Sequence, residues 1–243
     1  MDRYIWQDNS LAQVGLRDFL RQSILPLGQA FIFGGMNREI ARKGKDNFNS
    51  DVDVVVDASA AVVFELASTL SATPNKFGGY GYRHPRWKID FWALESTWAA
   101  KTGHVELKSA RDLLRCTFFD CDAILYDLQN SKVQALDGYL DKLRERILDI
   151  NLRPNPSPKG NLVRAVRRLL YWGFQPGPAL RQFISEHLDQ ATFLEIIDTE
   201  RKVYGNSAAE LFADAEYLRE ALFSRDNARF GTPFAPQILL PNL

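Results

Sequence analysis

An excess of charge of either sign is missing from this sequence of 243 residues, in which 30 Lys and Arg residues balance 30 Asp and Glu residues. A neutral chain exerts no overall attraction on nucleic acid, so any such attraction has to come from a local basic surface. Cysteine is also scarce, with only Cys116 and Cys121. Their spacing matches no metal-binding motif, and we expect buried thiols in a reducing compartment rather than a disulfide or a zinc site.

Long apolar runs and a signal-peptide pattern are missing too. No run approaches the roughly 20 residues that a membrane-spanning helix needs, and residues 1–13 have no apolar core segment. The composition, with 46% hydrophobic and 25% charged residues, is that of an ordinary globular protein. We therefore expect a soluble, cytoplasmic protein without a membrane partner.

Residue periodicity predicts a mixed half followed by a helical half. Strands are predicted at 29–33, 51–56, 87–94, 121–126 and 132–136. Helices are predicted at 10–25, 37–43, 59–70, 107–114, 139–148 and through most of 162–222, and residues 71–85 are read as an irregular or hairpin connection. Three prolines within 151–160 indicate a linker. The expected fold class is α+β, a small mixed sheet with flanking helices in a domain at 1–150, followed by an all-helical domain at 151–243.

Three aspartates fall on two of the predicted strands. Asp51 and Asp53 are two residues apart, so both point to one face of the strand while Val52 and Val54 face the core. Asp90 lies within an otherwise apolar strand, where an unpartnered carboxylate is costly. We predict that the three carboxylates hold Mg²⁺ or Mn²⁺ ions, and that Asp90 can accept the proton of an attacking hydroxyl. A solvated strand start and an ordinary salt bridge are the alternative interpretations.

A double glycine, Gly34-Gly35, stands between a predicted strand and a predicted helix. Without Cβ atoms the backbone can approach a triphosphate closely, and the amides of the helix start favour negative charge. A Walker A loop and a dinucleotide fingerprint are both missing, which argues against a P-loop protein and a Rossmann-type oxidoreductase. A plain turn is the alternative.

The segment from Ile150 to Ser185 is basic and contains no acidic residue. Its helical part, 161–173, has apolar residues on one side and three arginines on the other. We predict a positive surface that faces the phosphates of a triphosphate, an RNA backbone, or both. An ordinary solvated face is the alternative. The basic residues are Arg153, Lys159, Arg164, Arg167, Arg168 and Arg181.

In this order the segments resemble the class II tRNA nucleotidyltransferase and bacterial poly(A) polymerase family, within the polymerase-β-like nucleotidyltransferase superfamily. The family's Gly-Gly-x-x-Arg-Asp turn is matched by residues 34–39 (GGMNRE), and its Asp-x-Asp strand by residues 51–53 (DVD). Residues 119–127 and 164–174 match later segments, and Asp90 stands where a third carboxylate is expected. The resemblance covers residues 28–175.

The resemblance implies a polymerase-β-like fold and template-independent transfer of a nucleoside monophosphate from a nucleoside triphosphate to an acceptor hydroxyl. It implies an RNA, tRNA-like 3′ end as the acceptor and Mg²⁺ as the cofactor. Contacts to RNA or to phosphate are assigned to Lys159 and Arg168. The residues assigned to the nucleotide are Gly34, Gly35, Arg38, Ser50, Asp122, Arg164 and Arg167.

The sequence departs from the family at three places. Residues 116–118 replace a pair of arginines and an Asp, Asp122 replaces an Asn that helps to hold the nucleotide, and residues 157–161 lack the Glu-Asp-x-x-Arg signature that reads the base. The family's preference for C and A is therefore not carried over. Two alternatives stay open: transfer to a small molecule, a protein or a nucleotide, and a non-catalytic protein of this fold that binds nucleotide or RNA.

Overall fold

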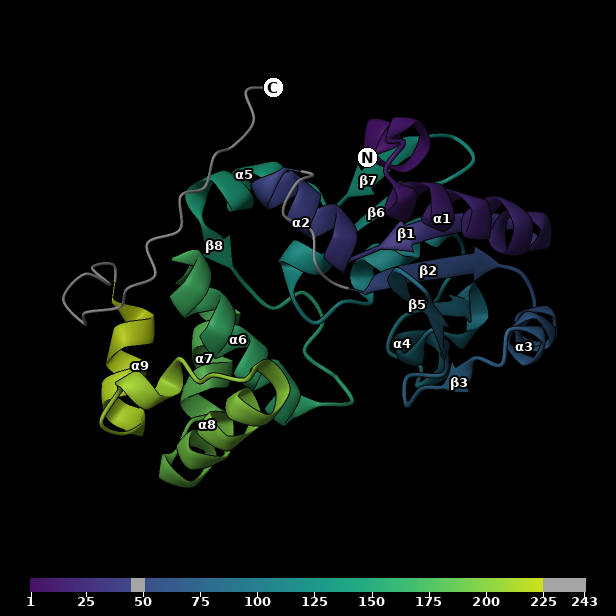
Figure 1. The fold of residues 1–243 in the computed structure, drawn as a ribbon. Helices are drawn as coiled ribbons and strands as arrows, with labels where there is room; N and C mark the ends of the chain where they lie inside the picture. Colours follow the sequence, from purple (N-terminus) through teal and green to yellow (C-terminus); the bar gives the residue numbers. More distant parts are fainter. Residues whose placement is uncertain (45–50, 225–243) are drawn as a thin grey trace. The chain divides into compact units, whose positions relative to one another are not determined.

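The computed structural model describes residues 1–44 and 51–224 (Figure 1). These residues form two compact units, of which the first comprises 1–117 and 121–137 and the second 118–120 and 138–224. The domain boundary that the sequence places after residue 150 stays a prediction. No helix among these residues has both the length and the apolar character needed to cross a membrane.

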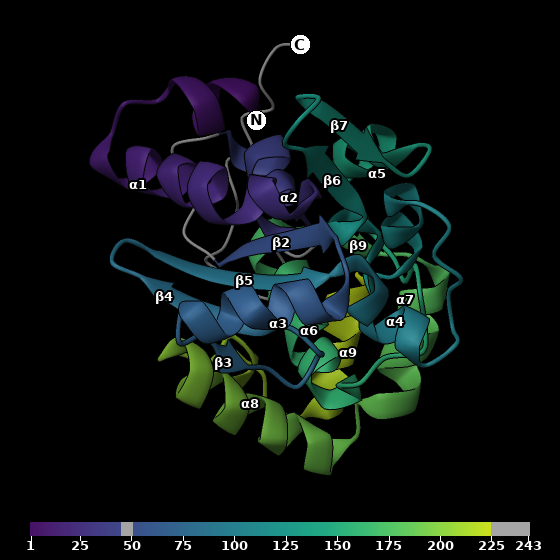
Figure 2. The ribbon, with the colours of Figure 1, turned by 90° about the vertical axis from the view of Figure 1, so that its right-hand side faces the viewer.

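The first unit is built on a mixed β-sheet. Within the described residues its seven strands follow the order β3-β4-β5-β2-β1-β6-β7. Strands β2 and β5 pair in parallel (Figure 2), and the other neighbours pair antiparallel. The strands are β1 (Gln29–Phe33), β2 (Val52–Asp57), β3 (Thr73–Pro74), β4 (Tyr80–His84), β5 (Trp87–Ala93), β6 (Ile124–Asp127) and β7 (Lys132–Ala135). The predicted fold class is confirmed.

Helices of the first unit cover one face of this sheet. The even-numbered residues Val52, Val54 and Val56 of β2 are fully buried there, in one apolar cluster with residues of three helices. The helices are α1 (Leu11–Phe19), α2 (Gly35–Lys43) and α3 (Ala60–Thr69). Ser10 and Ser59 cap the first turns of α1 and α3, because their hydroxyl oxygens accept backbone N–H groups.

One connecting segment refines the sequence prediction, and another differs from it. Residues 73–84 form a hairpin from β3 and β4. The helix predicted at 107–114 is instead a 3₁₀ helix at Ala110–Arg115, which starts late because Ser109 and Asp112 form a reciprocal capping box. A short helix α4 (Trp98–Lys101) follows β5.

The second unit is mainly helical, as predicted. Its helices are α5 (Tyr139–Glu145), α6 (Pro158–Trp172), α7 (Pro178–His187), α8 (Gln190–Tyr204) and α9 (Ala215–Phe223). Two predictions fail in detail. Helix α5 ends before Leu148, because Arg146 adopts a left-handed conformation with φ 57°. Strand pairing also persists beyond residue 160, since β9 (Gln175–Pro176) pairs in parallel with β8 (Ile147–Leu148).

Candidate active site

The three aspartates singled out in the sequence share one face of the sheet. The register of the parallel pair β2 and β5 sets Asp53 beside Asp90. Asp51 immediately precedes β2 and lies two positions from Asp53, so it points to the same face. Neighbouring strands are about 4.8 Å apart, and residues two apart on one strand are about 7 Å apart. The carboxylates are therefore close neighbours on two strands that are distant in the sequence.

Burial and like charges make Asp53 costly to ionise. The pKa of Asp53 is raised from its ordinary value of 3.8 to about 8, and burial is the largest cause. The negative charges of Asp90 and Asp51 add to this rise in pKa, and that of Asp122 contributes further. The guanidinium of Arg38 opposes the rise but does not cancel it. Without a cation, these surroundings keep Asp53 protonated up to about pH 8, and its ionised form needs additional positive charge nearby.

The donor set of this site fits a hard divalent cation. Burial also raises the pKa of Asp90, and the charge of Asp51 adds to the rise, against the opposing effects of Arg83 and of a hydrogen bond from Asn75. Among residues 1–44 and 51–224, no group of three or more His, Cys, Asp or Glu side chains is already arranged around a metal position. Carboxylate oxygens are nevertheless the ligands that Mg²⁺ prefers, and a cation would offset the repulsion that raises both pKa values.

The double glycine forms a tight turn at the same end of the sheet. Phe33, the last residue of β1, pairs with Asp53, so the turn that follows it lies next to the start of β2. Gly34 has φ 64°, a conformation that side-chain-bearing residues rarely adopt, and Gly35 begins helix α2. The N–H of Gly34 donates to the carbonyl of Ile124 (2.9 Å), which ties the turn to β6.

Asn37 fixes this turn and was not singled out by the sequence analysis. Its side chain is buried, and its Nδ2 donates to the carbonyl of Ile32 (2.7 Å) and to that of Ile124 (3.4 Å). The residue therefore joins the ends of β1 and β6 below the glycine turn. Only its position inside the turn motif could have indicated this role.

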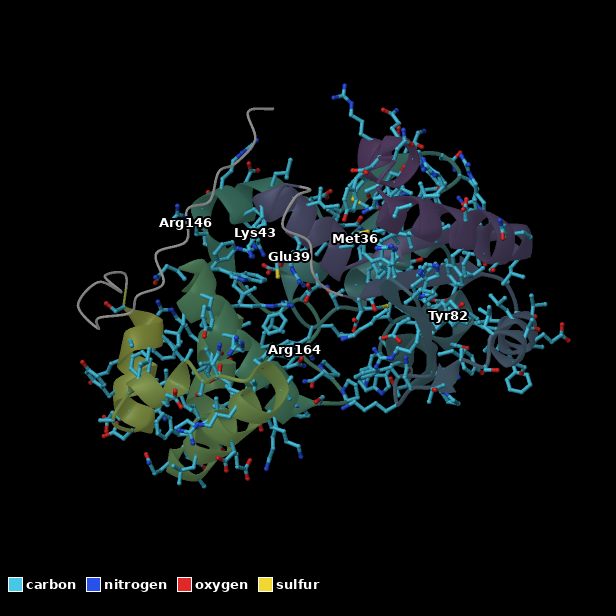
Figure 3. The ribbon with its side chains drawn as sticks, in the orientation of Figure 1. Met36, Glu39, Lys43, Tyr82, Arg146 and Arg164 are labelled. Atoms are coloured by element: carbon cyan, nitrogen blue, oxygen red, sulfur yellow. The ribbon has the colours of Figure 1, made fainter. Side chains whose placement is uncertain are left out.

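Arg38 is held beside the carboxylates by an ion-pair network on α2. Its guanidinium pairs with Asp122 and, over 3.1 Å, with Glu39. Glu39 also pairs with Arg42 (2.9 Å) and Lys43 (3.6 Å), and Figure 3 shows Glu39 and Lys43 along the same helix. Burial acts to raise the pKa of Glu39, but these cations outweigh it and lower the pKa. Arg38 is thus kept charged and oriented, and partly neutralised by two acids.

In the second unit, the prediction of three arginines on one open face of helix α6 is wrong for Arg168. That side chain is buried, and its guanidinium stacks over Phe119 (4.4 Å) and Trp172 (5.0 Å). Arg164 is exposed and contacts the side chain of Asn161. Helical spacing in the sequence placed Arg168 on the same side as Arg164 and Arg167. In the structure its guanidinium instead packs on aromatic rings inside the unit.

Acids from distant segments neutralise several cations of the basic stretch. Lys159 pairs with Glu195 of α8 (2.6 Å), and Arg153 pairs with Glu186 of α7. Arg167 pairs with the fully buried Glu200 (3.0 Å) and lies over the rings of Tyr171 (4.6 Å) and Tyr204 (4.0 Å). The absence of acids between Ile150 and Ser185 is real in the sequence, but the fold supplies them from outside that stretch.

The predicted site residues thus divide between the units. The first unit brings together Gly34, Gly35, Arg38, Asp51, Asp53, Asp90 and Asp122. Lys159, Arg164, Arg167 and Arg168 belong to the second unit. Ser50 lies outside the described residues.

No protein-family model matches this chain, and no curated protein matches it significantly. Solved structures do. A CCA-adding enzyme with CTP is 18% identical, with 84% of this chain and 47% of that one covered and a TM-score of 0.53. The Bacillus stearothermophilus CCA-adding enzyme in complex with CTP is 17% identical, with 77% and 48% covered and a TM-score of 0.53. The Thermotoga maritima CCA-adding enzyme complexed with tRNA is 18% identical, with 84% and 47% covered and a TM-score of 0.50.

These likenesses define a class of fold. The chain has the fold of the nucleotidyltransferase head region, a mixed sheet followed by helices, and the predicted resemblance is confirmed at that level. More particularly, the chain shares this fold with the part of three CCA-adding enzymes that it covers. The chain spans about half the length of these solved proteins.

Proposed function

We propose that this protein is a metal-dependent nucleotidyltransferase, which moves a nucleoside monophosphate from a nucleoside triphosphate to an acceptor hydroxyl. The observation that carries the proposal is the register of β2 and β5, which sets Asp53 beside Asp90 on the face that Asp51 shares. The glycine turn follows Phe33, the strand partner of Asp53. A carboxylate cluster next to a turn able to accept phosphates is the arrangement that metal-assisted displacement at phosphorus requires.

Each residue has a role in this proposal. Asp51, Asp53 and Asp90 would hold Mg²⁺, or Mn²⁺ in its place, and the bound cations supply charge stabilisation for the attacking and leaving oxygens. Gly34 and Gly35 would seat the triphosphate against the start of α2, where backbone N–H groups and the helix dipole favour negative charge. Arg38 and Asp122, which pair with each other, are assigned to the nucleotide.

The reaction is a single displacement. The acceptor oxygen forms a bond to the α-phosphorus, the bond from that phosphorus to the oxygen that bridges to the β-phosphate breaks, and pyrophosphate leaves. The proton of the acceptor hydroxyl goes to the carboxylate of Asp90. A carboxylate within hydrogen-bonding reach of the hydroxyl can act as such a general base.

The acceptor that we propose is an RNA 3′ end. Support comes from the fold shared with the Thermotoga maritima CCA-adding enzyme, which was solved with tRNA, and from the exposed Arg164 of α6. The ion pairs of Lys159 and Arg153 favour a second candidate, a small acceptor, because paired cations attract a phosphate backbone less strongly. Incubation with each labelled triphosphate, with total RNA and separately with a metabolite extract, shows which product carries the label.

The chemistry is tested with the double variant Asp51→Asn and Asp53→Asn. We expect it to lose Mg²⁺-dependent transfer of labelled nucleotide by a factor of at least about 10³, since metal charge stabilisation is worth several kcal/mol. Asp57→Asn is the matched control, because Asp57 is an exposed aspartate at the other end of the same strand. It should transfer nucleotide at the wild-type rate. Undiminished transfer by a folded double variant contradicts the proposal.

A further inference from the structure

The hairpin between β3 and β4 is organised around one side chain, Asn75. Its Oδ1 accepts the backbone N–H groups of Phe77 and Gly79, each over 3.0 Å. Its own backbone N–H donates to the carbonyl of Gly79 (2.8 Å). Because Oδ1 is committed to the turn, the direction of the other amide atom, Nδ2, is fixed as well.

Asn75 follows β3 on the face that carries Asp90, because Thr73, two residues before it, pairs with Gly81, and Gly81 pairs with Asp90. The amide of Asn75 also acts to lower the pKa of the Asp90 carboxyl group. The hairpin also makes room for that carboxylate, since Gly81 is the strand partner of Asp90 and a Cβ at Gly81 would lie 3.0 Å from Oδ1 of Asp90. Any side chain at position 81 would crowd the carboxylate. The hairpin thus supplies both a donor and the space for the third carboxylate of the site.

We propose that Asn75 is a positioning residue, which holds the carboxylate of Asp90 in the orientation needed for a divalent cation and for the acceptor hydroxyl. This inference rests on the proposed function of the carboxylate site. A neutral amide suits the role, because it fixes one carboxylate oxygen without adding a positive charge that would compete with the cation. Partners that orient metal-binding side chains in this way are commonly worth about 10- to 100-fold in metal affinity or activity.

Two substitutions separate positioning from a merely structural role in the turn. Asn75→Asp keeps the oxygen that accepts Phe77 and Gly79, since Asp suits such turns as well as Asn does, but it replaces the donor by a like charge. Asn75→Ser keeps a weaker turn acceptor and removes the donor without adding charge. A structural role predicts that Asn75→Asp behaves as wild type, whereas a positioning role predicts that both variants are impaired.

Asn130→Asp is the matched control. Asn130 donates its Nδ2 to Asp127 over 2.9 Å in the turn after β6. Asp127 pairs with Phe31 in the middle of β1, whereas Asp53 pairs with Phe33, the last residue of that strand. The same chemical change is thus made in the same sheet but away from the carboxylate site.

The first measurement is steady-state nucleotide transfer at saturating Mg²⁺. We expect kcat to fall about 10- to 100-fold in both Asn75 variants, with KM for the triphosphate changed less than kcat, and no comparable fall in Asn130→Asp. Wild-type kcat in Asn75→Asp overturns the inference, even if Asn75→Ser is impaired.

The second measurement does not need turnover: the melting temperature is followed as Mg²⁺ is added. Asn75→Ser should need about tenfold more Mg²⁺ than wild type for the half-maximal rise, and an unchanged Mg²⁺ requirement overturns the inference. If wild type transfers no nucleotide, the proposed function fails and the Mg²⁺ titration alone decides the role of Asn75. A wild-type protein whose melting temperature does not change with Mg²⁺ contradicts both the proposed function and the proposed role of Asn75.

Discussion

At the scale of single residues, the carboxylates of the site lower the free energy of unfolding of the metal-free protein, and they are the groups that the proposed chemistry needs. Asp53 is half-buried among three other acids, and burial together with their charges raises its pKa to about 8. A residue chosen for stability alone would not be ionisable at this position. Functional sites commonly retain such groups at the expense of the free energy of unfolding.

Asp53→Asn should therefore stabilise the metal-free protein while removing activity. The folded-state pKa of about 8 lies above the ordinary value of 3.8, so the folded protein holds a proton on Asp53 that the unfolded chain releases between about pH 4 and pH 8. The free energy of unfolding consequently falls as the pH rises through this window, and the substitution removes this fall. Melting temperatures of wild type and Asp53→Asn, measured with a chelator at pH 5 and at pH 8, test this pH dependence.

The gain in melting temperature over wild type should be larger at pH 8 than at pH 5, and Asp57→Asn should show no such pH-dependent gain. A loss of melting temperature in Asp53→Asn at pH 8 would show that Asp53 is stabilised by its surroundings rather than strained by them.

At the scale of elements, the sequence predicts what depends on local pattern. Strands β1, β2 and β5 were predictable because apolar and β-branched residues fill them, and α1 and α3 because Ser10 and Ser59 stand before apolar repeats. The environment of Arg168 was not predictable, since its partner Phe119 is distant in sequence. The roles of Asn37 and Asn75 were missed for the same reason, because each contacts a strand that is not adjacent to it in the chain.

Glu200 of α8 is the ionic anchor of the second unit. It is fully buried, pairs with Arg167, and accepts the hydroxyl of Ser207 (2.7 Å) and the N–H groups of Ala208 and Ala209 (each 3.0 Å). Removing it leaves a partly buried guanidinium and several buried donors without their acceptor. The prediction that follows concerns stability only.

Glu200→Ala should lower the free energy of unfolding by about 3–5 kcal/mol in urea denaturation. Glu195→Ala, on the same helix, removes the exposed pair with Lys159 and should cost less than about 1 kcal/mol. Equal effects of the two substitutions would show that Arg167 does not depend on Glu200.

At the scale of the whole molecule, topology creates the site. The sequence indicated three aspartates and a glycine turn, but not that β5 crosses over to lie next to β2, or that β1 separates β2 from β6. These neighbours are set by long-range pairing of strands, on which local pattern carries no information. The division into two units, with residues 118–120 belonging to the second, has the same origin.

The most direct test of the carboxylate site is a crystal structure of the protein with Mn²⁺ and a non-hydrolysable nucleoside triphosphate, using the anomalous signal of manganese. We predict manganese peaks within coordinating distance of Asp51, Asp53 and Asp90, with the triphosphate against the turn at Gly34 and Gly35. Manganese bound only elsewhere, or a triphosphate held away from the glycine turn, would contradict the account.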